Sequence, residues 1–134
     1  MTRLEITRSL AAPTERVWHA WTAASELTRW FWPPSFAAEA SVDLSVGGAW
    51  HIRSSVAGMG VSGVFTAIEA AKRLAFTWHW DGEDAETLVT VTFESEGSAT
   101  LLTIVHDRFG DARAATDHEQ GWNDCLDRLP AALD

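Results

Sequence analysis

Hydrophobic and polar residues alternate near the start of the chain. Residues 3–10, RLEITRSL, place Leu4 and Ile6 on one side and Glu5 and Thr7 on the other. Alternation with a period of two is typical of a half-buried β-strand. We therefore predict a strand over these residues.

Two short helices are expected after this strand. In AAPTERVWHAW, residues 11–21, Pro13 suits the first helical position because proline has no N–H to leave unpaired. SELTRW, residues 25–30, predicts a second helix with Ser25 at its N-cap. The two prolines at 33–34 then stop helical structure.

From Phe36 to His106 the alternation returns, interrupted by short turn sequences rich in glycine. Such short connections predict an antiparallel meander, because parallel strands need long crossovers. The expected strands cover residues 38–43, 49–55, 60–68, 73–80, 86–94 and 99–106.

The same alternation assigns one face of the sheet to the interior. A slip of one residue would expose the whole set to water, so the faces are well specified. Thr77, His51 and His79 are expected to point away from the core. The predicted inward positions are Trp50, Ile52, Leu74, Phe76, Trp78, Trp80, Thr87, Val89, Val91, Phe93, Thr100, Leu102, Ile104 and His106.

The last segment carries one apolar stripe at helical spacing. Its members are Trp122, Cys125, Leu126, Leu129 and Leu133, with Ala115 and His118 further back along the same face. TDHE at 116–119 fits a capping box, and a start near Asp111 is the alternative. Pro130 is expected to end or kink the helix.

Together these elements predict an α+β fold in one domain spanning residues 1–134. A long antiparallel sheet with one bulky face needs a cover, and the final helix carries a matching stripe. We expect a curved antiparallel sheet of about seven strands wrapped around the C-terminal helix, with two short helices after the first strand.

The formal net charge of −9 argues against nucleic acid and anionic membranes as partners, since both call for a basic surface. Cys125 is the only cysteine, so no intrachain disulfide can form. The sequence opens without a signal-peptide pattern, and no apolar run approaches the roughly 20 residues of a membrane helix. We expect a cytoplasmic protein without membrane insertion.

GMGVSG, residues 58–63, matches the dinucleotide fingerprint G-x-G-x-x-G. That fingerprint works only where it opens a helix, whereas a strand pattern continues here, so we predict a glycine-rich hairpin tip.

The five histidines lack the spacings of metal sites, and we expect neither a metal nor a cofactor. His106 and His118 alone fall on inward faces. Each is either a hydrogen-bonded interior histidine or a polar contact at the end of a pocket.

No catalytic constellation stands out. Asp43, Asp107, Asp111 and Glu119 are candidates by chemistry only, and no nucleophile elbow is present.

The aromatic residues are the strongest anomaly, with eight Trp, six Phe and no Tyr. They form either a plain core or the walls of a cavity, because a concave sheet under one helix leaves a volume at one end. The candidate cavity residues are Trp32, Phe36, Trp50, Ile52, Phe65, Phe76, Trp78, Trp80, Val89, Val91, His106, His118, Trp122, Cys125 and Leu126.

Several segments occur in an order typical of one family: APTERVWHAWT, VDLSVGGAWHI, the Gly63-x-Phe65 strand with Ile68, RLAFTWHW, TLVTVTFE, ATLLTIVHDRF and HEQGWNDCLDRL. On these segments the chain resembles the activator-of-heat-shock-protein-ATPase-homologue (AHSA-type) branch of the START-like superfamily, also called SRPBCC, in its single-domain bacterial form. The resemblance implies a helix-grip fold with a deep cavity between the sheet and the C-terminal helix. Related families bind or transform lipids, polyketides and other apolar molecules.

Three functions follow as hypotheses. The favoured one is a binding protein for a small apolar or aromatic molecule. An enzyme of the cyclase or hydratase kind would use the same cavity, with His106 or a nearby carboxylate meeting the substrate. A co-chaperone or stress-response protein is the third, although the pattern shows no exposed apolar patch for a chaperone contact. A homodimer is left open.

Overall fold

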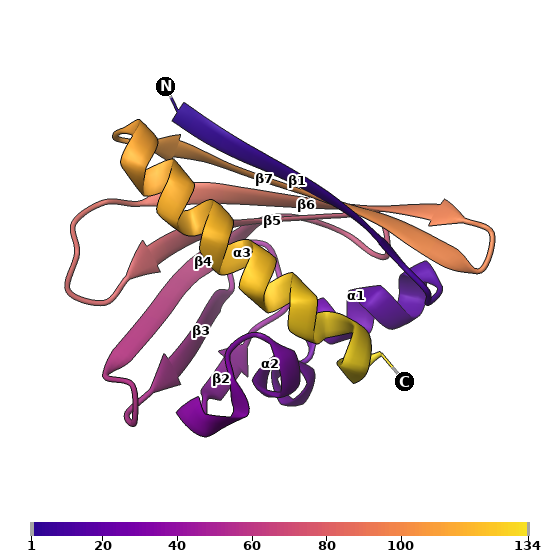
Figure 1. Ribbon diagram of the computed structural model, residues 1–134, viewed down its shortest axis with the longest axis horizontal. Helices are drawn as coiled ribbons and strands as arrows, with labels where there is room; N and C mark the ends of the chain where they lie inside the picture. Colours follow the sequence, from indigo (N-terminus) through magenta and orange to yellow (C-terminus); the bar gives the residue numbers. More distant parts are fainter. Residues whose placement is uncertain (1, 134) are drawn as a thin grey trace.

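The computed structural model describes residues 2–133 and contains one seven-stranded antiparallel sheet in the order β1-β7-β6-β5-β4-β3-β2. The long helix α3 crosses one face of this curved sheet, and the short helices α1 and α2 lie beside its C-terminal end (Figure 1). The elements are β1 (Thr2–Leu10), α1 (Thr14–Thr22), α2 (Ala24–Trp30), the 3-10 turn η1 (Pro34–Phe36), β2 (Glu39–Val42), β3 (Ala49–Ser54), β4 (Met59–Glu69), β5 (Arg73–Trp80), β6 (Thr87–Glu96), β7 (Ala99–Phe109) and α3 (Ala112–Ala132).

The predicted α+β helix-grip architecture is confirmed. Every predicted strand is present, with ends that differ by at most three residues from those expected. The first strand pairs with the last, as in the register Ile6 opposite Ile104. The remaining pairs join strands that follow one another along the chain, as a meander requires.

The helix ends required three corrections. Pro13 is the N-cap of α1 and not its first helical residue. The N-cap of α2 is Ala23, not Ser25, because Ala23 alone separates the two helices in an extended conformation and α2 begins directly after it. The capping box at 116–119 is not used: α3 starts after Asp111, whose Oδ1 accepts the N–H of Ala114 at 2.8 Å.

Pro130 lies inside the last turn of α3, and the helix ends at Ala132, two residues later. The glycine motif at 58–63 behaves as predicted. Gly58 occupies the turn between β3 and β4 with a φ of +68°, and β4 follows it in place of a helix. The motif is therefore a hairpin tip.

The alternation correctly identified the inward face of the sheet. Val89, Val91, Leu102 and Ile104 are fully buried, and the α3 residues Leu126 and Leu129 are fully buried as well. Large apolar residues from both sides thus fill the space between sheet and helix, which is the main source of stability in such a fold.

Thr77 departs from the expected pattern because it is buried although it lies on the outer face. Its Oγ1 accepts the N–H of Val64 at 2.9 Å, in a stretch where the pairing of β4 with β5 is irregular. Gly63 makes this possible, since a Cβ at that position would overlap the Thr77 carbonyl.

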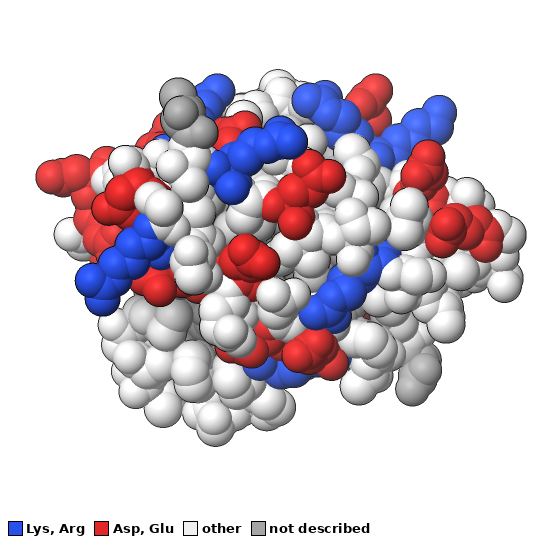
Figure 2. Space-filling view, turned by 45° about the horizontal axis from the view of Figure 1, so that its top comes forward, with Lys and Arg blue, Asp and Glu red and all other residues white. Residues whose placement is uncertain are grey.

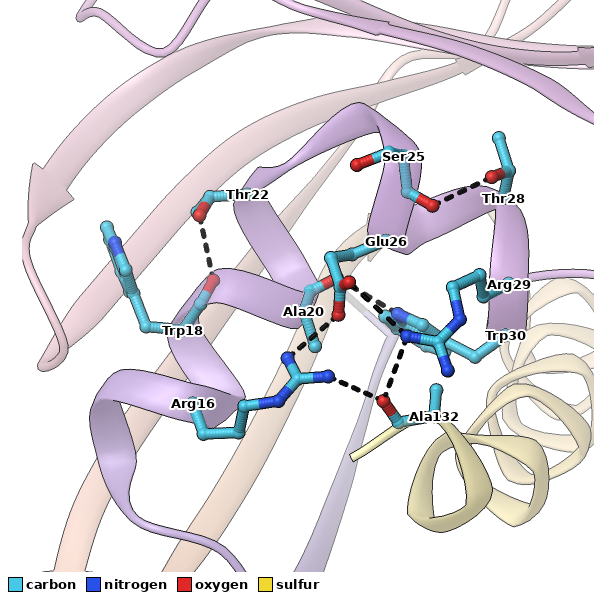
Figure 3. A network of polar contacts seen from close by, with 10 residues as sticks. All are labelled: Arg16, Trp18, Ala20, Thr22, Ser25, Glu26, Thr28, Arg29, Trp30 and Ala132. Atoms are coloured by element: carbon cyan, nitrogen blue, oxygen red, sulfur yellow. Dashed lines mark hydrogen bonds and ion pairs between the residues drawn. The ribbon is translucent and has the colours of Figure 1, made fainter. Parts of the chain in front are cut away.

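The C-terminal end of α3 is held by charged side chains from α1 and α2 (Figure 3). Arg16 and Arg29 both donate hydrogen bonds to the Ala132 carbonyl, at 2.6 and 3.3 Å, and both pair with Glu26. Burial alone would raise the pKa of the Glu26 carboxyl, but the hydrogen bond and charge of Arg16, with Arg29, outweigh it and lower that pKa. This end of the helix is therefore fixed.

Candidate functional site

A cavity of about 350 Å³ opens beside the middle of α3; we call it the outer cavity. Its wall opposite the helix comes from the segment after α2, where Pro33 and Pro34 end helical structure and start η1. Its main aromatic and titratable lining residues are Phe31, Trp32, Phe36, Trp78, Trp80, His118 and Trp122.

The rings of the outer cavity stand in fixed mutual orientations. Trp32 and Trp80 are parallel within 6°, with centroids 6.3 Å apart. Trp78 and Trp122 are tilted by 47° at 5.2 Å. Trp80 is only half-buried, in contrast to the fully inward position expected, because it lies where the sheet ends beside this cavity.

His118 lines the outer cavity, and both of its ring nitrogens are engaged. The indole Nε1–H of Trp80 donates to His118 Nε2 at 2.9 Å, and His118 Nδ1 lies 2.7 Å from the Ala114 carbonyl. A carbonyl only accepts, so these partners assign the proton to Nδ1. His118 therefore holds the Trp80 ring in place at the cavity wall.

His106 is fully buried and does not line the outer cavity. Trp122 Nε1–H donates to His106 Nδ1 at 3.0 Å, so the ring proton sits on Nε2, which is 2.6 Å from Thr87 Oγ1. Burial, with a smaller electrostatic contribution from the neighbouring His118, lowers the pKa of His106 to about 3. The ring is neutral at pH 7 and fully engaged by its partners.

The helical side of the outer cavity contains Gly121, which is exposed in the middle of α3. Apart from its chain neighbours and the backbone of its own helix, a Cβ there would meet no atom of the described residues within 4 Å. Glycine inside a helix costs about 1 kcal/mol relative to alanine. The glycine thus lowers the stability of α3 at the point where the cavity opens.

Charged residues of α3 border the opening. Arg128 donates to the Trp30 and Phe31 carbonyls at 3.0 and 2.8 Å, which ties the facing segment to the helix. Asp117 and Asp124 also line the opening. Figure 2 shows acidic and basic groups interspersed over much of one face, and a surface without either at its lower left.

Cys125 lies in the wall of the outer cavity, and its S–H donates to the Phe31 carbonyl at 2.8 Å. Burial raises the pKa of Cys125 to about 12, although Arg128 acts in the opposite direction. The thiol stays protonated at neutral pH, so it serves as a small apolar wall residue and not as a nucleophile.

A second, inner cavity of about 20 Å³ lies deeper in the grip. It adjoins the outer cavity, because Phe31 and Trp78 line both. Since one water needs about 10–15 Å³ of such space, the inner cavity has room for little more than one small group. Its other aromatic residues are Trp21, Trp50, Phe65 and Phe76.

The structure divides the predicted site residues into three groups. Those lining the outer cavity are Trp32, Phe36, Trp78, Trp80, His118, Trp122 and Cys125. Those lining the inner cavity are Trp50, Ile52, Phe65, Phe76 and again Trp78. Val89, Val91, His106 and Leu126 line neither and are fully buried.

Sequence reasoning missed several lining residues. Phe31 and Pro33 follow the end of a helix, where no periodicity assigns a direction. Met59 comes from the hairpin between β3 and β4. Gly121 offered one signal, since a glycine inside a helical stripe marks a place without packing.

Within residues 2–133, no group of three His, Cys, Asp or Glu side chains is placed to hold a metal ion. Over the same range, none of the helices combines the length and hydropathy needed to cross a membrane.

A family model described as "Activator of Hsp90 ATPase homolog 1-like protein" matches residues 11–134. Among solved structures, protein CV1439 from Chromobacterium violaceum is similar over 98% of this chain and 96% of its own, with 25% identity and a TM-score of 0.87. PFC0360w, an HSP90 activator from Plasmodium falciparum, is similar over 99% and 96%, with 26% identity and a TM-score of 0.81. CalU16 from Micromonospora echinospora is similar over 98% and 76%, with 26% identity and a TM-score of 0.79. The comparison with curated proteins found no match.

Proposed function

The chain belongs to the family of Activator of Hsp90 ATPase homolog 1-like proteins, and on that premise we propose that it binds a small apolar or aromatic molecule in the outer cavity. The observation that carries this proposal is the 350 Å³ space walled by aromatic rings between α3 and the segment after α2. Ligand sites are typically concave, mostly apolar and about 300–1,000 Å³ in volume.

The residues that line the outer cavity would make different kinds of contact with a ligand. Trp32 and Trp80 provide parallel ring faces, and Trp122 provides a third ring from α3. These rings supply large apolar contact areas at low entropic cost, because an aromatic side chain has few rotatable bonds. Asp117, Asp124 and Arg128 at the opening contact any polar part of the ligand that reaches solvent.

Gly121 allows a direct test, because a larger side chain there enters open space. We expect Gly121→Leu to fill part of the outer cavity and to weaken binding of 2-acetylnaphthalene and 2-isopropenylnaphthalene at least about tenfold. Equilibrium dialysis measures the affinity, and native mass spectrometry measures the 1:1 stoichiometry.

Gly110→Leu is the matched control. Gly110 also has no atom within 4 Å of a Cβ, but it lies before α3 and does not line the outer cavity. Equal binding by wild type and both variants would mean that the probes bind elsewhere. That result would contradict the proposal.

A second candidate rests on the similarity to PFC0360w, an HSP90 activator. It predicts that adding the protein to an Hsp90 chaperone raises the chaperone's ATPase rate. Gly121→Leu separates the two functions, because a surface contact away from the outer cavity would keep the stimulation while ligand binding is lost.

Neither His106 nor Cys125 supports the cyclase or hydratase alternative. Such an enzyme needs an acid or base that reaches the substrate. His106 is occupied by Trp122 and Thr87, and the Cys125 thiol stays protonated.

A further inference from the structure

The interior tryptophans differ in the hydrogen bonding of their indole N–H groups. Trp80 and Trp122 donate to His118 and His106, and Trp30 donates to the Ala20 carbonyl at 2.9 Å. By contrast, the Nε1–H groups of Trp21, Trp50 and Trp78 are buried and have no acceptor among the described residues.

All three of these tryptophans line the inner cavity. Each side chain is more than nine-tenths buried, with 4 to 6% exposed. Almost all buried polar groups in proteins are paired, so three tryptophans with unpaired donors in the lining of one small space are a strong departure from the norm.

We propose that the inner cavity receives a carbonyl oxygen of the ligand, whose apolar or aromatic body occupies the outer cavity. This inference rests on the proposed function and specifies the ligand class: a ketone, aldehyde, ester or amide with an apolar body. Phe31 and Trp78 line both cavities, with ring centroids 6.0 Å apart, so these two rings must separate for the carbonyl group of a ligand in the outer cavity to enter the inner one.

The chemistry of the lining favours a carbonyl over a water molecule. A water molecule needs acceptors for its own two hydrogens, and the side chains around the inner cavity are hydrocarbon or indole, which offer none. A carbonyl oxygen only accepts, and it accepts up to two hydrogen bonds.

The same lining favours a neutral carbonyl over a carboxylate. In the described part of the chain no charged residue lines the inner cavity, and burying an unpaired charge costs far more than burying a dipole. The space of about 20 Å³ also fits one oxygen atom better than a whole carboxylate group.

Two probes of nearly the same shape test this inference. 2-Acetylnaphthalene carries a carbonyl where 2-isopropenylnaphthalene carries a C=CH2 group. We expect the ketone to bind about tenfold more tightly, the effect of one to two additional hydrogen bonds to otherwise unpaired donors. Trp50→Phe removes one donor and keeps an aromatic ring, so it should reduce this preference to about threefold or less.

Indole ¹H–¹⁵N NMR spectra of the wild-type protein provide a readout that does not depend on any variant folding. The ketone should move one or two of the Nε1–H signals of Trp21, Trp50 and Trp78 downfield, and the isopropenyl probe should move none of them. Trp18→Phe is the control substitution, because Trp18 packs on Phe93 and lines neither cavity. It should keep the full preference for the ketone.

The possible outcomes distinguish the carbonyl site in the inner cavity from apolar binding in the outer cavity. Equal affinity for both probes, with unmoved indole signals, would overturn the carbonyl site and leave the apolar binding function standing. A crystal structure in which a water accepts from two of these N–H groups and remains there beside the bound ketone would overturn it as well. Binding of neither probe would overturn both claims.

Discussion

The outer and inner cavities use the same residue type in opposite ways. Around the outer cavity, histidines accept the indole N–H groups of Trp80 and Trp122, so these rings are fixed as walls. The N–H groups of Trp21, Trp50 and Trp78, which line the inner cavity, lack acceptors within residues 2–133; Trp78 lines the outer cavity as well. An indole whose N–H is already hydrogen-bonded has a structural role, whereas a buried indole with an unpaired N–H can still donate a hydrogen bond to a ligand.

The surrounding fold compensates for the unpaired donors. Each costs about 1–3 kcal/mol relative to a paired group. Burial of the apolar stripe of α3 and the arginine contacts to the Ala132 carbonyl keep α3 packed against the sheet. Fewer of the polar groups are hydrogen-bonded in the lining of the inner cavity than at the C-terminal end of α3.

Among the substitutions considered, removal of the His106 side chain should have the largest effect on stability. His106→Ala leaves the Trp122 N–H and the Thr87 hydroxyl without their partner and opens a cavity in the core. We expect the free energy of unfolding to fall by roughly 3–5 kcal/mol in urea denaturation. His51→Ala, on the outer face, should change it by less than about 0.5 kcal/mol. Similar losses in both variants would contradict the assignment of His106.

Two matched substitutions compare the cavities directly. Trp122→Phe leaves His106 Nδ1 without its donor, whereas Trp50→Phe removes a donor that has no acceptor. Both lose the same ring atoms, so we expect Trp122→Phe to be about 2 kcal/mol more destabilising. Urea denaturation measures both. An equal loss would show that Trp50 already has a permanent partner.

The pH dependence of the free energy of unfolding tests whether His106 is held neutral in the folded protein. The folded state holds the pKa of His106 at about 3, against an ordinary value of 6.5. Between these values the unfolded chain binds more protons, so stability is lost as the pH falls below 6.5, by up to about 1.4 kcal/mol per pH unit. Between pH 6.5 and 5, His106→Gln should show a shallower decline than wild type. Identical slopes would mean that His106 is not held neutral.

The smallest expected effect lies at the opening of the outer cavity. Gly121→Ala places a methyl group in open space within α3, and it should raise the free energy of unfolding by about 1 kcal/mol. Thermal denaturation with Gly110→Ala as the comparison checks this. A loss of stability would show that the space beside Gly121 is filled.

The sequence predicted the sheet well because a period of two leaves only one inward face, and residues such as Val91 and Ile104 fall on it. It predicted less of the site. Whether rings such as Trp78 leave space depends on how they tilt against their neighbours, which no periodicity records. Ser25 was wrongly assigned as a cap because the spacing of two adjacent helices depends on their packing. The contrast between Trp122 and Trp50 depends on partners distant in sequence.

The most direct test of the proposed ligand site is a crystal structure of the protein with 2-acetylnaphthalene. We predict the naphthalene rings beside Trp32, Trp80 and Trp122 in the outer cavity, at one molecule per chain. Density for the probe only over the exposed side chains of Leu44 and Val46, with the outer cavity filled by its own residues, would contradict it.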